Sequence, residues 1–288
     1  MRDIPTSPRI AEIKRKTKKR LLRLIILIFI LIVSVILGLS YFSNDKHIII
    51  DNIIIDGTNI IDKNNVDSFI KEKLSGKYFY LFNKANSLIY PEGEIYNNLL
   101  EEFPRIEELN VSREGFKTLH IKIKERSGSY LYCGEQIPED QSLIGENCYF
   151  INNDGYIFDN APYFSGDIYF KYYIPIEDNT GALIGKNIMD KNRFYQLARF
   201  IDGIEALGFK ASYVILDKEG TSSLFLEKRA NNINPKIIFK TDDDLTIMLE
   251  NLSSAMSKSE FADEIKERYD TLSYIDLRFD NKVIYKFE

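Results

Sequence analysis

The chain has 288 residues, with 38 Lys and Arg against 43 Asp and Glu. Nine basic and two acidic residues lie in the first 23 positions, which leaves 29 basic and 41 acidic residues, a net charge of −12, for the rest. A charge of that sign argues against nucleic-acid binding. With only two His residues, a catalytic triad or metal centre built on His is not expected.

An uncharged apolar run, LIILIFILIVSVILGLSYF, occupies residues 24–42. At a rise of 1.5 Å per residue it extends about 28 Å, roughly one hydrocarbon core, and this predicts a transmembrane helix. A cleaved signal peptide is the alternative, because Gly38 and Ser40 are small residues spaced as in a cleavage site. Its apolar core would exceed the usual length of about 7–15 residues, which favours the anchor.

Basic residues gather on one side of the apolar run, while Asp45 and Lys46 cancel on the other. The basic residues are Lys14, Arg15, Lys16, Lys18, Lys19, Arg20 and Arg23. The positive-inside rule therefore predicts a cytoplasmic tail at residues 1–23 and an extracytoplasmic location for the rest. Attraction of the basic run to anionic lipid is a further hypothesis.

After the apolar run, the β-branched segment Ile48–Gly57 is typical of a strand with at least one buried face. A helix is predicted at 66–75, with Asn64 or Asn65 as its cap and Gly76 as its stop.

A second helix is predicted to begin near Pro91 and to end before the next proline. The alternating segments RIEELNVSRE and TLHIKIKER, on either side of Gly115, then predict a β-hairpin. Strand, two helices and hairpin make a small α+β domain with its helices on one face of the sheet, which we assign to residues 47–126.

The remaining residues, 127–288, predict a β-rich domain. Its short β-prone runs are SYLYC, CYFINN, YIFDN, DIYFKYYIP, SYVILD, SLFLEK, KIIFK, YIDLRF and KVIYKF. Helical spacing of apolar residues predicts helices at 190–207 and 242–256, with a shorter one at 260–269. Runs of strands interrupted by helices favour an α+β fold with a mostly antiparallel sheet over a doubly wound one.

Cys133 and Cys148 lie on successive predicted strands of a domain placed outside the cytoplasm. We expect a disulfide, because the intervening segment holds turn residues and closing a loop of about 15 residues is worth roughly 3 kcal/mol. Free buried thiols and a metal site are the alternatives.

Other candidate sites have simple structural explanations. His47 and His120 are expected on the surface, and GALIGKN at 181–187 is a residue short of a phosphate-binding loop and lacks the Ser or Thr that meets magnesium, so an ordinary turn is predicted. Three acids at 242–244 suggest a metal site or, more simply, the N-terminus of a helix.

The apolar helix, the strand ending at Gly57, the segment FPRIEELNVSRE and then TLHIKIKER resemble the POTRA domain of the bacterial FtsQ/DivIB cell-division family. CYFINNDGYIFDNAP and SYIDLRFDNKVIYKF resemble the signature segments of that family's second, β-rich domain. The resemblance covers residues 48–287, apart from 163–240, where no motif is recognised.

The resemblance implies a bitopic, non-enzymatic division protein in the cell membrane, concentrated at the septum, which recruits and holds FtsB- and FtsL-like proteins. It implies no cofactor, small-molecule substrate or nucleic acid. Two alternatives remain: a membrane-anchored extracytoplasmic envelope enzyme, and a POTRA-bearing component of secretion or outer-membrane assembly. The first needs convergent acid and base groups, and the second usually has repeated POTRA units or a membrane barrel.

Two docking surfaces are expected. One is an edge strand of the first domain, with Lys122 and Lys124 as charges that alternatively only keep that edge soluble. The other is the last pair of strands, where the resemblance implies that FtsB adds a strand; a plain closing hairpin is the alternative. Ile275, Leu277 and Phe279 are expected in the core. The expected partner-binding residues are Tyr274, Asp276, Arg278, Val283, Tyr285 and Phe287.

Overall fold

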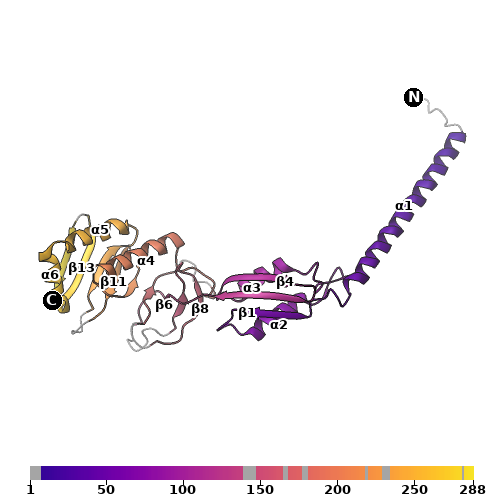
Figure 1. Cartoon of the computed structure of the whole chain (residues 1–288). Coiled ribbons are helices and arrows are strands. Elements are labelled where there is room, and N and C mark those ends of the chain that lie inside the picture. The colour runs from indigo at the N-terminus through magenta and orange to yellow at the C-terminus, as the bar shows by residue number, and fades with distance from the viewer. Residues whose placement is uncertain are drawn as a thin grey trace, which may run out of the picture. The chain divides into compact units, whose positions relative to one another are not determined.

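The computed structural model describes residues 8–138, 147–164, 168–176, 181–217, 220–228, 234–280 and 282–288 (Figure 1). The fold is α+β, as predicted, with one long apolar helix and a large, mostly antiparallel sheet. The chain divides into two compact units, Met1–Glu125 and Arg126–Glu288. Each unit has its own cluster of buried apolar side chains.

The first unit begins with the helix α1 (Pro8–Ser43). Its part Thr17–Ser43 has a mean hydropathy of 3.1 and is the one described helix that is long and apolar enough to cross a membrane. Large apolar side chains along it are exposed, among them Leu27, Phe29 and Leu31 at 65 to 66%. Such a surface is suited to lipid rather than to water.

The rest of the first unit is a three-stranded sheet covered by two helices. The strands are β1 (Asn52–Asp56), β4 (Ile106–Glu114) and β5 (Thr118–Glu125), and the helices are α2 (Lys63–Leu74) and α3 (Glu92–Glu102). β4 and β5 form the predicted antiparallel hairpin, and β1 pairs in parallel with β5, which gives the order β1-β5-β4. The core of this unit lies between the helices and one face of the sheet.

The expected start of the first strand and the expected cap of the first helix were wrong. Residues 48–51 precede β1, because Ile50 donates its N–H to the carbonyl of Ala85 and not to a strand of the sheet. The helix begins earlier than predicted, because the carboxylate of Asp62 accepts the N–H of Asn64.

Between the helices lies a small hairpin that the sequence patterns did not predict. It consists of β2 (Lys77–Tyr78) and β3 (Phe82–Asn83), joined by residues 79–81, and Leu81 donates its N–H to the carbonyl of Tyr78 across the turn. The two central residues of this turn, Phe79 and Tyr80, have positive φ angles of 49° and 62°, which Asn and Gly usually supply in hairpin turns.

The second unit is built on a nine-stranded sheet with the order β14-β13-β12-β11-β10-β9-β6-β7-β8. Each of the nine predicted β-prone runs overlaps one of these strands. They are β6 (Tyr130–Tyr132), β7 (Tyr149–Ile151), β8 (Ile157–Asn160), β9 (Lys171–Tyr173), β10 (Ala211–Ile215), β11 (Thr221–Leu226), β12 (Lys236–Lys240), β13 (Leu272–Phe279) and β14 (Lys282–Phe287).

Helices lie where the sequence periodicity predicted them: α4 (Lys191–Ala206), α5 (Leu245–Met256) and α6 (Ser259–Glu267), the last followed by the short 3-10 helix η2 (Tyr269–Thr271). Asp190 and Asp244 cap α4 and α5 by accepting backbone N–H bonds. The parallel pairs β9–β10 and β12–β13 are the ones whose connections contain these helices.

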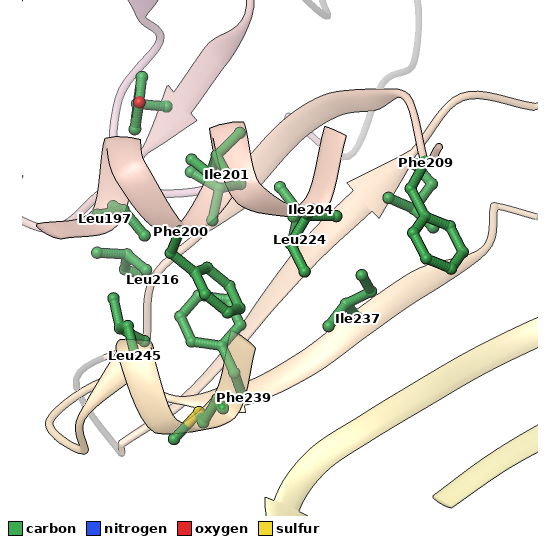
Figure 2. Close-up of a cluster of buried hydrophobic side chains, with 14 of the residues drawn as sticks. Leu197, Phe200, Ile201, Ile204, Phe209, Leu216, Leu224, Ile237, Phe239 and Leu245 are labelled. Carbon is green, nitrogen blue, oxygen red and sulfur yellow. The ribbon is translucent and has the colours of Figure 1, made fainter. Parts of the chain in front are cut away.

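The core of the second unit lies between the helices and one face of the sheet. Apolar side chains of α4 face those of the strands below them, as Figure 2 shows for Phe200, Ile204, Leu224, Ile237 and Phe239. Alternate residues on the central strands are buried, and those between them are partly exposed. One face of the sheet is therefore covered by helices and the opposite face is more open.

Candidate partner-binding site

The expected partner-binding residues lie on two strands with different positions in the sheet. β13 pairs with β12 on one side and with β14 on the other, so its main-chain groups are engaged in the sheet. β14 pairs only with β13 among the described strands and forms the edge. A partner strand can therefore add to β14 and not to β13.

The direction of the β14 main chain follows from one hydrogen bond. Glu288 donates its N–H to the carbonyl of Thr271 across the ladder, at 2.8 Å. Because N–H groups alternate in direction along a strand, those of Val283, Tyr285 and Phe287 point away from β13, toward the open edge. These residues hold the main-chain groups that an added strand would meet.

The side chain of Tyr285 is directed toward α6. Its hydroxyl donates to a carboxylate oxygen of Glu264 at 2.8 Å, and its ring contacts those of Phe261 and Phe287 at centroid distances of 5.0 and 5.6 Å. The hydrogen bond to Glu264 raises the pKa of the Tyr285 hydroxyl. This side chain therefore links α6 to the edge strand, while the main-chain N–H of Tyr285 is directed toward the open edge.

Phe287 is held by a cation–π contact, since the guanidinium carbon of Arg268 lies 4.0 Å from the centre of its ring. Arg268 is itself paired with Glu264, at 3.0 Å. Phe287, Arg268, Glu264 and Tyr285 thus form one connected group that joins α6 to β14. These contacts hold the edge strand against α6, and such preorganisation is what would lower the entropic cost if a strand were added there.

Asp276 and Arg278 form an ion pair on β13. The guanidinium donates through Nε to Oδ1 at 3.0 Å and through Nη2 to Oδ2 at 2.7 Å, and the backbone N–H of Arg278 also donates to Oδ1 at 3.0 Å. Burial raises the pKa of Asp276, but the hydrogen bonds and charge of Arg278 outweigh it, so the pKa lies below its ordinary value. The Arg278 side chain is 35% exposed and that of Asp276 only 5%.

The expected alternation along β13 fails at one end. Ile275 and Leu277 are buried, as predicted, but Phe279 is 47% exposed and Asp276 is buried. A register irregularity between Asp276 and Phe279 shifts the later residues relative to β14, which accounts for the exposure of Phe279. Asp276 precedes this irregularity, and its buried carboxylate is paired with Arg278. Arg278 and Tyr274 keep partly exposed side chains, and these can contact a partner at the edge.

The more open face of the sheet carries a row of side chains that the sequence patterns did not predict. Tyr213 stacks on Phe225 at a centroid distance of 4.5 Å, and the Lys236 ammonium lies 5.7 Å from the centre of the Phe225 ring. Strand register continues this row from Lys236 to Tyr274 and then to Lys286 on the edge strand. The sequence holds no signal for the row, because it depends on the register between distant strands.

Cys133 and Cys148 are joined by a disulfide, with 4.2 Å between their Cα atoms. Both cysteines adjoin paired strands, since β6 and β7 are antiparallel neighbours in the sheet. The bond therefore links the segments next to β6 and β7, which lie near the end of the sheet opposite to the edge strand β14.

The expectation that Lys122 and Lys124 lie on an edge strand of the first unit was wrong. Lys122 and Lys124 lie on β5, which is the central strand, so the edges of that sheet are β1 and β4. The parallel pairing of β1 with β5 is what covers the expected edge. His120, also on β5, bonds to Asp56 at 2.7 Å, and this hydrogen bond lowers the pKa of that carboxyl.

The other sequence candidates have local structural roles. Residues 183–186 turn through a bond from the N–H of Lys186 to the carbonyl of Leu183, and Asp243 pairs with Lys240 at 3.0 Å. His47 is exposed. Within the described residues, no group of three or more His, Cys, Asp or Glu side chains is placed to hold a metal ion.

No protein-family model matches the sequence of this chain, and its comparison with curated proteins gives no match.

Proposed function

We propose that this chain is a bitopic cell-division protein that is anchored by α1 and recruits other division proteins through its extracytoplasmic units. The observation that carries the proposal is the order of its elements. An apolar helix leads into a strand, two helices and a hairpin, and a larger sheet follows whose last described strand is an open edge. The sequence resemblance to the FtsQ/DivIB family supports the same assignment.

The basic residues before the apolar stretch of α1 support an orientation with the tail in the cytoplasm and both units outside it. The disulfide agrees with an oxidising compartment. In this proposal the protein acts by binding and not by catalysis, and its partners are small bitopic proteins similar to FtsB and FtsL.

The binding mode we propose is strand addition to β14. Main-chain bonds from Val283, Tyr285 and Phe287 give affinity. The partly exposed side chains of Tyr274 and Arg278 beside the edge give specificity, since Tyr and Arg are favoured anchors of interfaces.

Localisation in living cells tests the proposal. A fluorescent fusion of the full chain is expected to concentrate at the division site of the source organism. A variant that lacks residues 48–126 but keeps the anchor is expected to spread over the whole membrane. Unchanged septal localisation of this variant would remove the recruitment role of the first unit, and an even distribution of the full chain would contradict the division role.

A further inference from the structure

The C-terminal end of α1 is hydrogen-bonded directly to the β2–β3 hairpin. The hydroxyl of Ser40 donates to the carbonyl of Leu81 at 2.9 Å, and the hydroxyl of Ser43 accepts the N–H of Asn83 at 3.1 Å. Ser43 is only 4% exposed. The hairpin is therefore fixed against the last turn of the apolar helix.

These bonds set the depth of the hairpin relative to a membrane. The uncharged run ends at Phe42, and Ser40 lies two residues before that end, which is about 3 Å along the helix axis. If the run spans the hydrocarbon core, the carbonyl of Leu81 lies level with the boundary between acyl chains and headgroups. The residues just before Leu81 must then lie at the same level or close to it.

Those residues are Phe79 and Tyr80, which form the tip of the hairpin. Their exposed fractions are 86% and 95%, so their rings contact almost nothing else in the protein. Both have positive φ angles, which bulky side chains rarely adopt and which a Gly or Asn would adopt at lower cost. Folding of the hairpin thus gives no reason for two aromatic residues at this position.

Two further turns of the same unit present apolar side chains beside the helix end. The side-chain amide of Asn86 donates to the carbonyl of Ser43 at 3.1 Å, and Leu88 and Ile89, which follow it, are 55% and 43% exposed. Phe116, in the turn between β4 and β5, is 53% exposed.

The turn that holds Phe116 is joined to the same region. The guanidinium of Arg113 donates to the carbonyl of Ser87 at 2.6 Å, and its carbon lies 5.4 Å from the centre of the Phe116 ring. On α1 itself, Tyr41 is 88% exposed. Apolar and aromatic side chains therefore gather around the point where the apolar helix enters the folded unit.

We propose that Phe79 and Tyr80 insert into the interfacial layer of the outer membrane leaflet, so that the first unit rests on the bilayer through this hairpin. The inference requires α1 to span the membrane and does not depend on the division role. Aromatic rings favour the headgroup level of a bilayer, and the tip continues the lipid-facing surface of α1. The contact fixes the first unit against the membrane and limits its rotation about the end of the helix.

Tryptophan fluorescence tests this inference directly, because the chain contains no Trp. Full-length Tyr80→Trp would be reconstituted into vesicles of phosphatidylcholine and phosphatidylglycerol, with and without bromine atoms on the acyl chains near the headgroup. The matched control is Ile60→Trp, since Ile60 is 67% exposed in the same unit. Ile60 follows the C-terminal end of β1, whereas α1 precedes the N-terminal end of that strand. A third variant, Phe29→Trp, reports on insertion of α1.

We expect Tyr80→Trp to emit at shorter wavelength in vesicles and to lose most of its emission to brominated lipid, while Ile60→Trp keeps its emission. If Tyr80→Trp behaves like Ile60→Trp while Phe29→Trp is quenched, the helix spans the membrane and the hairpin inference is overturned. If Phe29→Trp is also unquenched, the anchor and the inference fail together. The first failure leaves the proposed function intact, whereas the second also removes the anchoring by α1 that the proposed function requires.

Discussion

Gly57 lies against the backbone of Ile123, so closely that a Cβ atom on Gly57 would overlap the carbonyl oxygen of that residue. Gly57 also has a φ of 86°, at the end of β1 where the chain leaves the sheet. The close approach joins β1 to β5, and a side chain at this position would have to push the two strands apart. Gly57→Ala is expected to lower the free energy of unfolding of the first unit by at least about 2 kcal/mol.

Gly76 provides the matched control, because its φ is 87° but a Cβ atom there would meet nothing within 4 Å. Gly76→Ala should cost about 1 kcal/mol, from backbone strain alone. Denaturant unfolding of both variants measures the difference, which reports the contact with Ile123. Equal losses in the two variants would show that this contact is unimportant.

The β2–β3 hairpin should become more stable when its tip is given the residues that its turn prefers. The double change of Phe79→Asn and Tyr80→Gly removes the backbone strain of two bulky residues with positive φ angles. It is expected to raise the free energy of unfolding by about 1–2 kcal/mol. Thermal unfolding in detergent measures this gain. A loss of stability would contradict this prediction and would mean that the rings stabilise the protein through contacts with the fold or with the detergent that surrounds α1.

The Asp276–Arg278 pair predicts a specific pH dependence. Because the pKa of Asp276 is lowered in the folded protein, the ionised carboxylate stabilises the fold above its unfolded pKa, and this contribution is lost as the pH falls through the folded pKa. Asp276→Asn should therefore be less stable than the parent chain at pH about 7, with the difference shrinking below about pH 4. A difference that stays constant with pH would contradict this role of the pair.

How far the sequence predicts this fold depends on the range of the interactions involved. Periodicity located the three helices of the second unit and all nine runs that become strands, because burial of one face acts locally. It did not find the parallel pairing of β1 with β5, the exposure of Phe279 or the turn at Phe79. Each of these depends on strand register or on a backbone conformation that the residue types disfavour.

For the candidate site, the sequence predicted the strand that carries it but not the side-chain contacts around it. The alternating run KVIYKF was recognisable as a strand. Because this strand lies at the edge of the sheet, the main-chain N–H groups of Val283, Tyr285 and Phe287 point away from the sheet. The link of Tyr285 to Glu264 was not foreseeable, since it depends on where α6 lies. Burial of Asp276 was also missed, because alternation alone placed it on the exposed face.

Strand addition at β14 predicts that a proline at Tyr285 weakens partner capture. Tyr285→Pro removes the N–H that faces the open edge, and a main-chain hydrogen bond of about 1 kcal/mol corresponds to roughly fivefold in affinity. Tyr285→Ala is the control, because it also loses the ring and the bond to Glu264 but keeps the N–H. Binding of the soluble segment of an FtsB-like protein to both folded variants measures the effect. Equal affinities would show that β14 is not the template.

Depletion of the protein in its source organism, followed by microscopy, tests the division role most directly. Loss of a division protein should give filaments or chains of undivided cells, with normal growth in mass until division fails. Expression of the full chain should restore division. Normal septation after depletion, with a change only in the composition of the cell surface, would rule out the division role and favour an envelope enzyme.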